Sequence, residues 1–270
     1  MNIDQPRSAF VRAGLKRRRV SYEFAVAWTR RGFILVLLIL WEIYGRFFAD
    51  RDFVRPPSAV VVALFDRILS DPAVLRAVGL TLAEVAVAFT CAMIVGLGVG
   101  VLVGWTGAGR KTFMPIILLV YAIPQVVLLP LVVLIFGLGP AAKIVFGFSH
   151  GVLPIIVNVV AGMRNVDQLY LRGARSMGAS RLDIARHVIF PHMVPSFFAG
   201  LRLAMTLTLV GVILAELYVS MAGIGYYTQI FAENFDPAPL FALISVLAAI
   251  AITLNEIVRI AERRFTRWLS

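Results

Sequence analysis

The sequence predicts an all-α protein that crosses a membrane several times as one polytopic domain. Hydrophobic residues make up 60% of the 270 residues and charged residues only 15%, whereas soluble globular chains carry about 25% charged residues. The apolar residues form six long runs, which lie too close together for a soluble core to fit between them. We therefore expect one membrane domain with six transmembrane helices.

Each apolar run comes close to the length of about 20 residues that a helix needs to cross the hydrocarbon layer. The runs are 32–48, 79–105, 113–136, 144–163, 193–220 and 240–258. Six spans place both termini on one side of the membrane. The expected organisation is an N-terminal segment 1–31, a transmembrane domain 32–260 and a C-terminal tail 261–270.

Basic residues are distributed unevenly around these spans, although the chain as a whole has a net charge of +11. Lys and Arg concentrate in 1–31, 105–112, 164–187 and 259–270, which the six spans place on the same side. The positive-inside rule assigns that side, with both termini, to the cytoplasm of a cell with an inner (plasma) membrane. The cytoplasmic loops and termini thus account for the net positive charge of the chain, and nucleic acid is not expected as a partner.

The segment 164–191 is the most polar part of the chain interior and is expected to form the longest cytoplasmic loop. Its pattern predicts two short helices that are separated by a break at 178–180 and closed by Pro191. Small residues such as Gly173 and Ala174 would let another surface approach the backbone. Two interpretations remain open: a docking helix for a partner protein, or a solvated basic loop beside anionic lipid.

The spacing of this loop resembles the EAA loop of ABC importer permeases. That pattern has Glu-Ala-Ala, three residues, Gly, nine residues, an aliphatic residue, one residue, a hydrophobic residue and Pro. The matching positions are Ala174, Gly178, Val188, Phe190 and Pro191. Arg172 stands where the pattern has Glu, and Gly173 where it has the first Ala.

The resemblance implies that this loop contacts an ATPase subunit. The implied coupling residues are Arg172, Gly173, Ala174, Arg175, Ser176, Met177, Gly178, Ala179, Asp183 and Pro191. The usual acidic contact is not carried over, which leaves Arg172 or Arg175 to pair with acidic residues of the ATPase.

The resemblance extends over 56–268 and includes the motifs at 137–139, 162–167, 200–202, and 215–216 with 223–226. These look like the permeases of the nitrate, sulfonate, taurine and bicarbonate importer group, which also contains carriers of thiamin-pyrimidine precursors. The group implies a type I ABC importer permease fold. It also implies a second permease copy, usually identical, two ATPase subunits, an extracytoplasmic substrate-binding protein and a small anionic solute of the sulfonate, nitrate, bicarbonate or carboxylate class.

No ATP chemistry or other catalysis is expected of this chain. It lacks a GxxxxGK[ST] loop, so ATP and Mg would be bound by the partner ATPase. The run Gly96-Leu97-Gly98-Val99-Gly100 is favoured as a helix-packing face rather than a dinucleotide loop, because small residues recur every four positions. His150, His187 and His192 have no zinc-site spacing.

Ionisable residues inside predicted spans are costly and usually have a partner or face a cavity. Glu84 and Glu216 lie near outer ends of spans, and each is either functional or an interfacial carboxylate paired with Lys143 or water. Arg202 lies near a cytoplasmic end, where its side chain is favoured to reach the interface.

Two uncharged polar residues lie at membrane depth. Gln125 follows Pro124, which frees a backbone carbonyl, and Asn158 lies in the fourth span. Together with Glu216 they are candidates for a translocation path, but they could equally bond only between helices. An ion-gradient-driven secondary transporter is the alternative function, and it would require an intramembrane carboxylate cluster or inverted repeats.

Overall fold

The computed structural model describes residues 6–266, and every regular element in that range is helical. Residues 1–5 and 267–270, which belong to the expected segments 1–31 and 261–270, lie outside the described residues. The elements are α1 (Pro6–Phe47), α2 (Pro57–Ala63), η1 (Leu64–Leu69), α3 (Pro72–Trp105), α4 (Gly107–Ala122), η2 (Gln125–Leu128), α5 (Leu129–Phe136), α6 (Pro140–Arg164), α7 (Gln168–Ser176), α8 (Arg181–Ile184), η3 (Ala185–Ile189), α9 (Phe190–Val219), α10 (Ile224–Glu233) and α11 (Pro237–Phe265).

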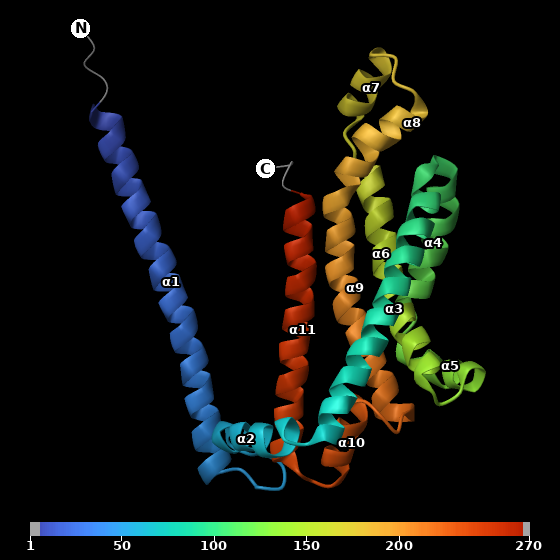
Figure 1. Ribbon diagram of the computed structural model, residues 1–270. Coiled ribbons are helices and arrows are strands. Elements are labelled where there is room, and N and C mark those ends of the chain that lie inside the picture. Colours follow the sequence, from blue (N-terminus) through green and yellow to red (C-terminus); the bar gives the residue numbers. More distant parts are fainter. Residues whose placement is uncertain (1–5, 267–270) are drawn as a thin grey trace.

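The centre of the molecule is a bundle in which α6 packs against both α3 and α9, with α4 and α11 on its flanks (Figure 1). Its core contains small and branched side chains such as Ala88, Val159 and Ala204, which are fully buried. Much of the outer surface is apolar as well, including Leu102, Leu134 and Ile252. An apolar surface around a packed bundle is what a membrane environment requires.

Gly96, Gly100 and Gly104 let α3 approach α6 closely. A Cβ atom at these positions would lie 2.8 Å from Ile155, 2.7 Å from Val159 and 2.6 Å from the sulfur of Met163, respectively. The expected packing role of this glycine stripe is therefore confirmed.

Within the described part of the chain, four helices are long and apolar enough to cross a membrane: α3, α6, the continuous run α8–η3–α9, and α11. The pair α4 and η2–α5 would make a fifth span, although it is bent by 83°. The expected first span, 32–48, corresponds to the C-terminal part of α1 and contains Glu42 and Arg46. The count of six spans thus remains a prediction.

The predicted span 113–136 is not one continuous helix. The helix breaks between Ala122 and Gln125, where Ile123 adopts an extended backbone conformation before Pro124. Proline cannot donate a backbone hydrogen bond and disfavours a helical conformation in the residue before it. As a result α5 turns away from the bundle (Figure 1).

Among the described residues, helix α1 meets the body near its C-terminal end, through a tight elbow with α2 and a ring contact between Trp41 and Phe241 of α11. The carboxylate of Glu42 accepts hydrogen bonds from the backbone N–H of Ser58 at 3.0 Å and from its hydroxyl at 2.8 Å. Gly45 lies so close that a Cβ there would be 2.9 Å from the nitrogen of Pro56. These contacts fix the angle at which α1 leaves the body, and α2 lies across the end of the bundle (Figure 1).

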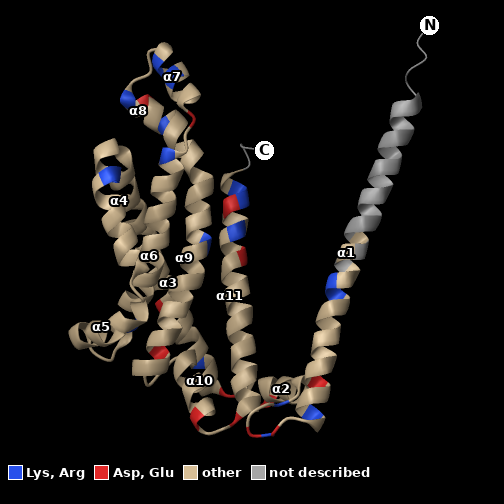
Figure 2. Cartoon of the chain, turned by 180° about the vertical axis from the view of Figure 1, so that it is seen from behind, with Lys and Arg blue, Asp and Glu red and all other residues tan. Residues whose placement is uncertain are grey.

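The two ends of the bundle differ in structure and charge. One end, the α7–α8 end, carries the short helices α7 and α8 and lies on the same side as the start of α1 and the end of α11 (Figure 1). Lys and Arg are prominent there, whereas acidic residues are more frequent at the opposite end, formed by α2 and α10 (Figure 2). We call this opposite end the α10 end.

Candidate functional site

The loop between α6 and α9 folds into two helices with well-formed caps. The Asp167 carboxylate accepts a hydrogen bond from the Leu169 N–H at 2.8 Å and so caps the start of α7. At the end of α7, the N–H groups of Gly178 and Ala179 bond to the carbonyls of Arg175 and Ala174. This is a Schellman motif, and it requires the positive φ of +77° that Gly178 adopts.

A capping box starts α8. The Ser180 hydroxyl accepts a hydrogen bond from the Asp183 N–H at 3.2 Å, and the Asp183 carboxylate accepts one from the Ser180 N–H at 3.0 Å. A further hydrogen bond from the Ser180 hydroxyl to this carboxylate lowers the pKa of Asp183 below its ordinary value. The break predicted at 178–180 is thus a rigid turn between two capped helices.

The predicted stop at Pro191 was wrong. The helix that begins at Arg181 continues through η3 into α9, and Pro191 lies in the first turn of α9. A proline is tolerated there because the wider turn of η3 precedes it. The loop is therefore joined rigidly to a membrane helix.

The surface of the loop that faces away from the bundle exposes apolar side chains between arginines. Ala174 and Ile184 are buried where α7 meets α8, but Leu169, Met177 and Leu182 are largely exposed. The arginines at 172, 175, 181 and 186 are also exposed. A Cβ added to Gly173 would meet no atom within 4 Å, so no packing inside this chain requires that glycine.

Two cavities flank the loop. One of about 370 Å³ lies beside α7 and is lined mainly by apolar side chains together with His187 and His192. The other, of about 560 Å³, is lined by Trp105 and Thr106 from the α3–α4 turn and by Arg175 and Arg181. Exposed apolar residues, arginines and hollows together form a surface suited to docking by another protein.

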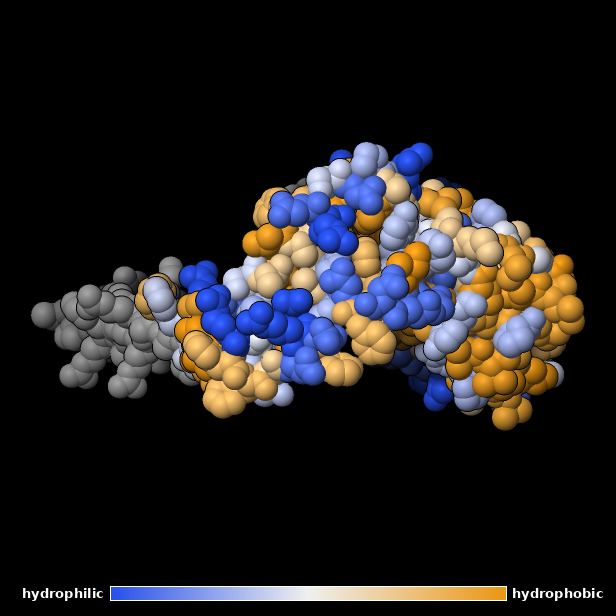
Figure 3. Space-filling view, turned by 90° about the horizontal axis from the view of Figure 1, so that it is seen from below, coloured by the Kyte–Doolittle hydropathy of each residue, from blue (hydrophilic) through white to orange (hydrophobic). Residues whose placement is uncertain are grey.

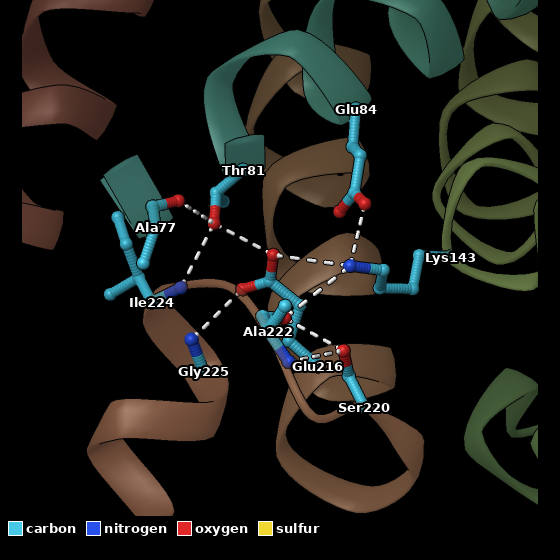
Figure 4. A network of polar contacts seen from close by, with 9 residues as sticks. All are labelled: Ala77, Thr81, Glu84, Lys143, Glu216, Ser220, Ala222, Ile224 and Gly225. Atoms are coloured by element: carbon cyan, nitrogen blue, oxygen red, sulfur yellow. Dashed lines mark hydrogen bonds and ion pairs between the residues drawn. The ribbon is translucent and has the colours of Figure 1, made fainter. Parts of the chain in front are cut away.

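A buried polar network lies at the α10 end and joins α3, α6, α9 and α10 (Figure 4). The Glu216 carboxylate on α9 accepts a hydrogen bond from the Thr81 hydroxyl at 2.7 Å and from the Gly225 N–H at 2.8 Å. The Thr81 oxygen accepts one from the Ile224 N–H at 3.0 Å. Glu216 and Thr81 together therefore cap the start of α10.

Lys143 on α6 supplies the positive charge of this network (Figure 4). Its ammonium nitrogen lies 2.5 Å from Glu84 Oε1 and 4.0 Å from Glu216 Oε1. All three side chains are at most 3% exposed. The expected pairing of these carboxylates with Lys143 is present, but it is deeply buried and contains two carboxyl groups for one ammonium.

Two glycines make room for the Glu216 side chain. Gly223 has φ +111°, and a Cβ there would lie 2.0 Å from Glu216 Oε1. A Cβ at Gly225 would lie 2.6 Å from that of Glu216. Glycine is needed at both positions of the Gly223-Ile224-Gly225 segment because the Glu216 carboxylate fills the space beside them.

The sequence alone did not reveal the role of Thr81 in this network, because Thr81 lies 135 positions from Glu216.

The three path candidates are not brought together. Asn158 donates to the carbonyl of Pro154 on its own helix at 2.9 Å and packs against Gly200. It lies about 22 Å along α6 from Lys143, at 1.5 Å per residue. Gln125 lies at the bend after α4, and its side-chain oxygen is buried with no hydrogen-bond partner among the residues that the structure describes.

Arg202 forms an ion pair with Glu262 on α11 instead of extending freely toward the interface. The pair is partly exposed, and further along the same two helices Asn255 on α11 donates a hydrogen bond to Thr206 on α9. These contacts hold α11 against α9. Among the described residues, no cluster of three or more His, Cys, Asp or Glu side chains could hold a metal ion.

Comparison with known proteins places these features in a family. Residues 92–267 match the family of binding-protein-dependent transport system inner membrane components. The chain is 29% identical over 238 residues to the taurine transport system permease protein of Escherichia coli K12, covering 87% of this chain and 86% of that one. It is 26% identical to a formylaminopyrimidine transport permease protein of Halalkalibacterium halodurans, covering 82% and 87%.

The fold is also shared with a solved structure. A chain of the MetNI methionine ABC transporter in an inward-facing conformation aligns with a TM-score of 0.64 at 20% identity, covering 72% of this chain and 96% of that one. The predicted all-α permease fold of type I ABC importers is thereby confirmed. Because the match at 92–267 extends over most of the membrane domain, the chain belongs to the inner membrane components of binding-protein-dependent transport systems, the permease subunits of ABC importers.

Proposed function

We propose that this permease forms the membrane path of an importer for a small anionic solute, with its α7–α8 end facing the cytoplasm. Membership of the family supports a non-catalytic subunit that works with a separate ATPase and a substrate-binding protein. The concentration of Lys and Arg at the α7–α8 end supports the orientation, since basic residues are retained on the cytoplasmic side (Figure 2).

The observation that carries the coupling role is the construction of the α7–α8 loop. It presents Met177 and Leu182 outward, fixes them with a Schellman motif and a capping box, and continues without a break into α9. A rigid lever of this kind can transmit an ATPase movement to the membrane helices as a rigid-body displacement.

The charge of the loop favours an acidic partner surface. Arg172 is exposed at the position where related loops carry Glu, and Arg175 lines the larger cavity beside the loop. We infer that carboxylates of the ATPase pair with these guanidinium groups around a pocket for Met177. The remaining coupling candidates, including Ser176, Ala179 and Asp183, shape the turn that holds this surface.

The proposed solute class rests on the relatives. The taurine permease carries a solute with a sulfonate group, which favours sulfonates and similar anions, whereas the formylaminopyrimidine permease favours a heterocyclic solute. Gln125 and Asn158 remain proposed path residues, since uncharged hydrogen-bonding groups suit transient contacts with a solute. For Glu216 we propose that it holds the start of α10 in place through its hydrogen bonds in the buried polar network.

The complex is proposed to contain two copies of this chain. Affinity purification from the native membrane in mild detergent, followed by mass spectrometry, tests the composition. We expect an ABC ATPase at one copy per permease and a single permease sequence. Recovery of the permease without any ATPase, both with and without ATP, would contradict the proposed function; a second permease sequence would contradict only the identical dimer.

A further inference from the structure

A cavity lined by arginines lies at the elbow between α1 and α2. It has a volume of about 330 Å³, and its lining includes Arg46, Arg51 and Arg55 together with Gly45, Ser58 and Val62. Acidic side chains are missing from this lining. The elbow is rigid, because Glu42 holds Ser58 and because Gly45 packs on Pro56.

Two of these arginines have no partner among the described residues. Arg46 is paired with Glu42 at 2.5 Å, so its charge is already balanced. Arg51 is exposed and makes no hydrogen bond or ion pair, and the half-buried Arg55 has a buried Nε without a hydrogen-bond partner. Asp50 and Asp52 lie in the same turn but outside the cavity lining; Asp50 accepts a hydrogen bond from the Asp52 N–H. The cavity therefore offers two guanidinium groups to an anion.

The surroundings of this cavity are strongly apolar. Tyr44, Phe47 and Phe48 at the end of α1 are exposed, and so is Val62 on α2. Every side chain of 33–40, further along α1, is also exposed and apolar. Seen from this end, hydrophilic residues gather over the α1–α2 connection with hydrophobic surface beside them (Figure 3).

We propose that this elbow is a binding site for a phospholipid with an anionic headgroup, whose phosphate pairs with Arg51 and Arg55 and whose acyl chains lie along α1. Guanidinium groups bind phosphate oxygens through paired, charge-assisted hydrogen bonds. The end of a membrane helix places them at the level of lipid headgroups. A ligand with an anionic head and apolar tails matches both the cavity and the exposed flank of α1.

The same guanidinium groups could also receive an acidic surface of a partner protein. That occupant would not use the exposed apolar flank that continues from the cavity along α1. The combination of charge and apolar surface at one place therefore favours the lipid.

Native mass spectrometry of the detergent-purified protein tests this site. Phosphatidylglycerol and phosphatidylcholine with identical acyl chains are titrated into the wild type and into the Arg51→Gln/Arg55→Gln variant. We expect the wild type to prefer phosphatidylglycerol, and the variant to bind it about tenfold more weakly, the effect of losing charge-assisted contacts. Binding of phosphatidylcholine should change little.

Arg76→Gln is the matched control, because Arg76 is exposed at the same end but outside the cavity and bonds to the Pro72 carbonyl of its own helix. This variant should keep the preference for phosphatidylglycerol. If the double glutamine variant does not fold, Arg51→Lys/Arg55→Lys keeps both charges and should retain more than half of the preference. Unchanged phosphatidylglycerol binding in the glutamine variant, or an equal loss with Arg76→Gln, would overturn the proposal.

Discussion

The two ends of this permease are stabilised in opposite ways. At the α7–α8 end, the caps of α7 and α8 join residues that are two to five positions apart, and the side chains between them are exposed. At the α10 end, Thr81 and Glu216 join across 135 positions and are fully buried. The first end presents a surface, whereas the second locks helices together, so substitutions at the two ends should affect different properties.

Lys143→Met should have the largest effect of the substitutions considered. It removes the ammonium group and leaves two buried carboxyl groups without a counter-charge, and breaking a buried ion pair in this way costs about 3–5 kcal/mol. The folded permease should lose thermal stability in detergent, as measured by the temperature of aggregation or unfolding.

Glu84→Gln is the matched variant for Lys143→Met. It leaves one carboxylate, Glu216, for one ammonium group, so the stability loss should be much smaller. Equal losses for the two substitutions would contradict the assignment of Lys143 as the centre of the network.

Glu216→Gln should reduce transport while leaving assembly with the ATPase intact. Glu216 accepts hydrogen bonds from the Thr81 hydroxyl on α3 and from the Gly225 N–H on α10, and an amide has only one oxygen to accept them. One of these two accepting contacts of the network is therefore lost, at about 1–3 kcal/mol. Transport in proteoliposomes and co-purification of the ATPase measure the two properties. Loss of co-purification would instead assign Glu216 to the general stability of the fold.

Gly178→Ala should uncouple ATP hydrolysis from transport without removing the permease from the membrane. A side chain at φ +77° strains the turn by about 1 kcal/mol and tilts α8 relative to α7. The ratio of solute transported to ATP hydrolysed should fall, and a larger residue should lower it further.

Gly79→Ala provides the control for that prediction. It makes the same change on α3 near the α10 end, away from the α7–α8 loop, where a Cβ meets open space and φ is not positive. A normal ratio is expected. A normal ratio for Gly178→Ala as well would show that the turn has no part in coupling.

The smallest effect concerns pH. The hydrogen bonds from Ser180 lower the pKa of Asp183 in the folded loop, so the capping box stabilises α8 above the unfolded pKa of about 3.9 and loses this effect as pH falls through the lower folded pKa. Asp183→Asn should weaken hydrogen-exchange protection of α8 relative to the wild type near neutral pH. The difference between the two proteins should disappear in acid; a difference independent of pH would contradict the role of the charge.

The sequence predicted the local features of the molecule well. Apolar runs identified α3, α6, α9 and α11, and the spacing of Gly96, Gly100 and Gly104 identified a packing face, because each signal lies within one helix. The break in the coupling loop could also be predicted from the sequence, because Gly178 and the Ser180–Asp183 capping box are formed by residues close together in the chain.

The remaining features depend on contacts between distant residues. The pairing of Arg202 with Glu262 and the capping of α10 by Thr81 require the helices to be packed first. The continuation of the helix through Pro191 depends on the wider turn of η3, for which the sequence has no clear signal. The sharp bend at Pro124 could be anticipated as a kink, but its size could not.

Site-directed cross-linking tests the central claim, that the α7–α8 end docks an ATPase, most directly. Met177 at that end is 83% exposed and Met221 at the α10 end is 88% exposed, so each can be changed to cysteine in a Cys91→Ser background without disturbing the core. In the assembled complex, Met177→Cys should cross-link to the ATPase subunit and Met221→Cys should not. A cross-link from Met221→Cys, or none from Met177→Cys while the ATPase is bound, would contradict the account.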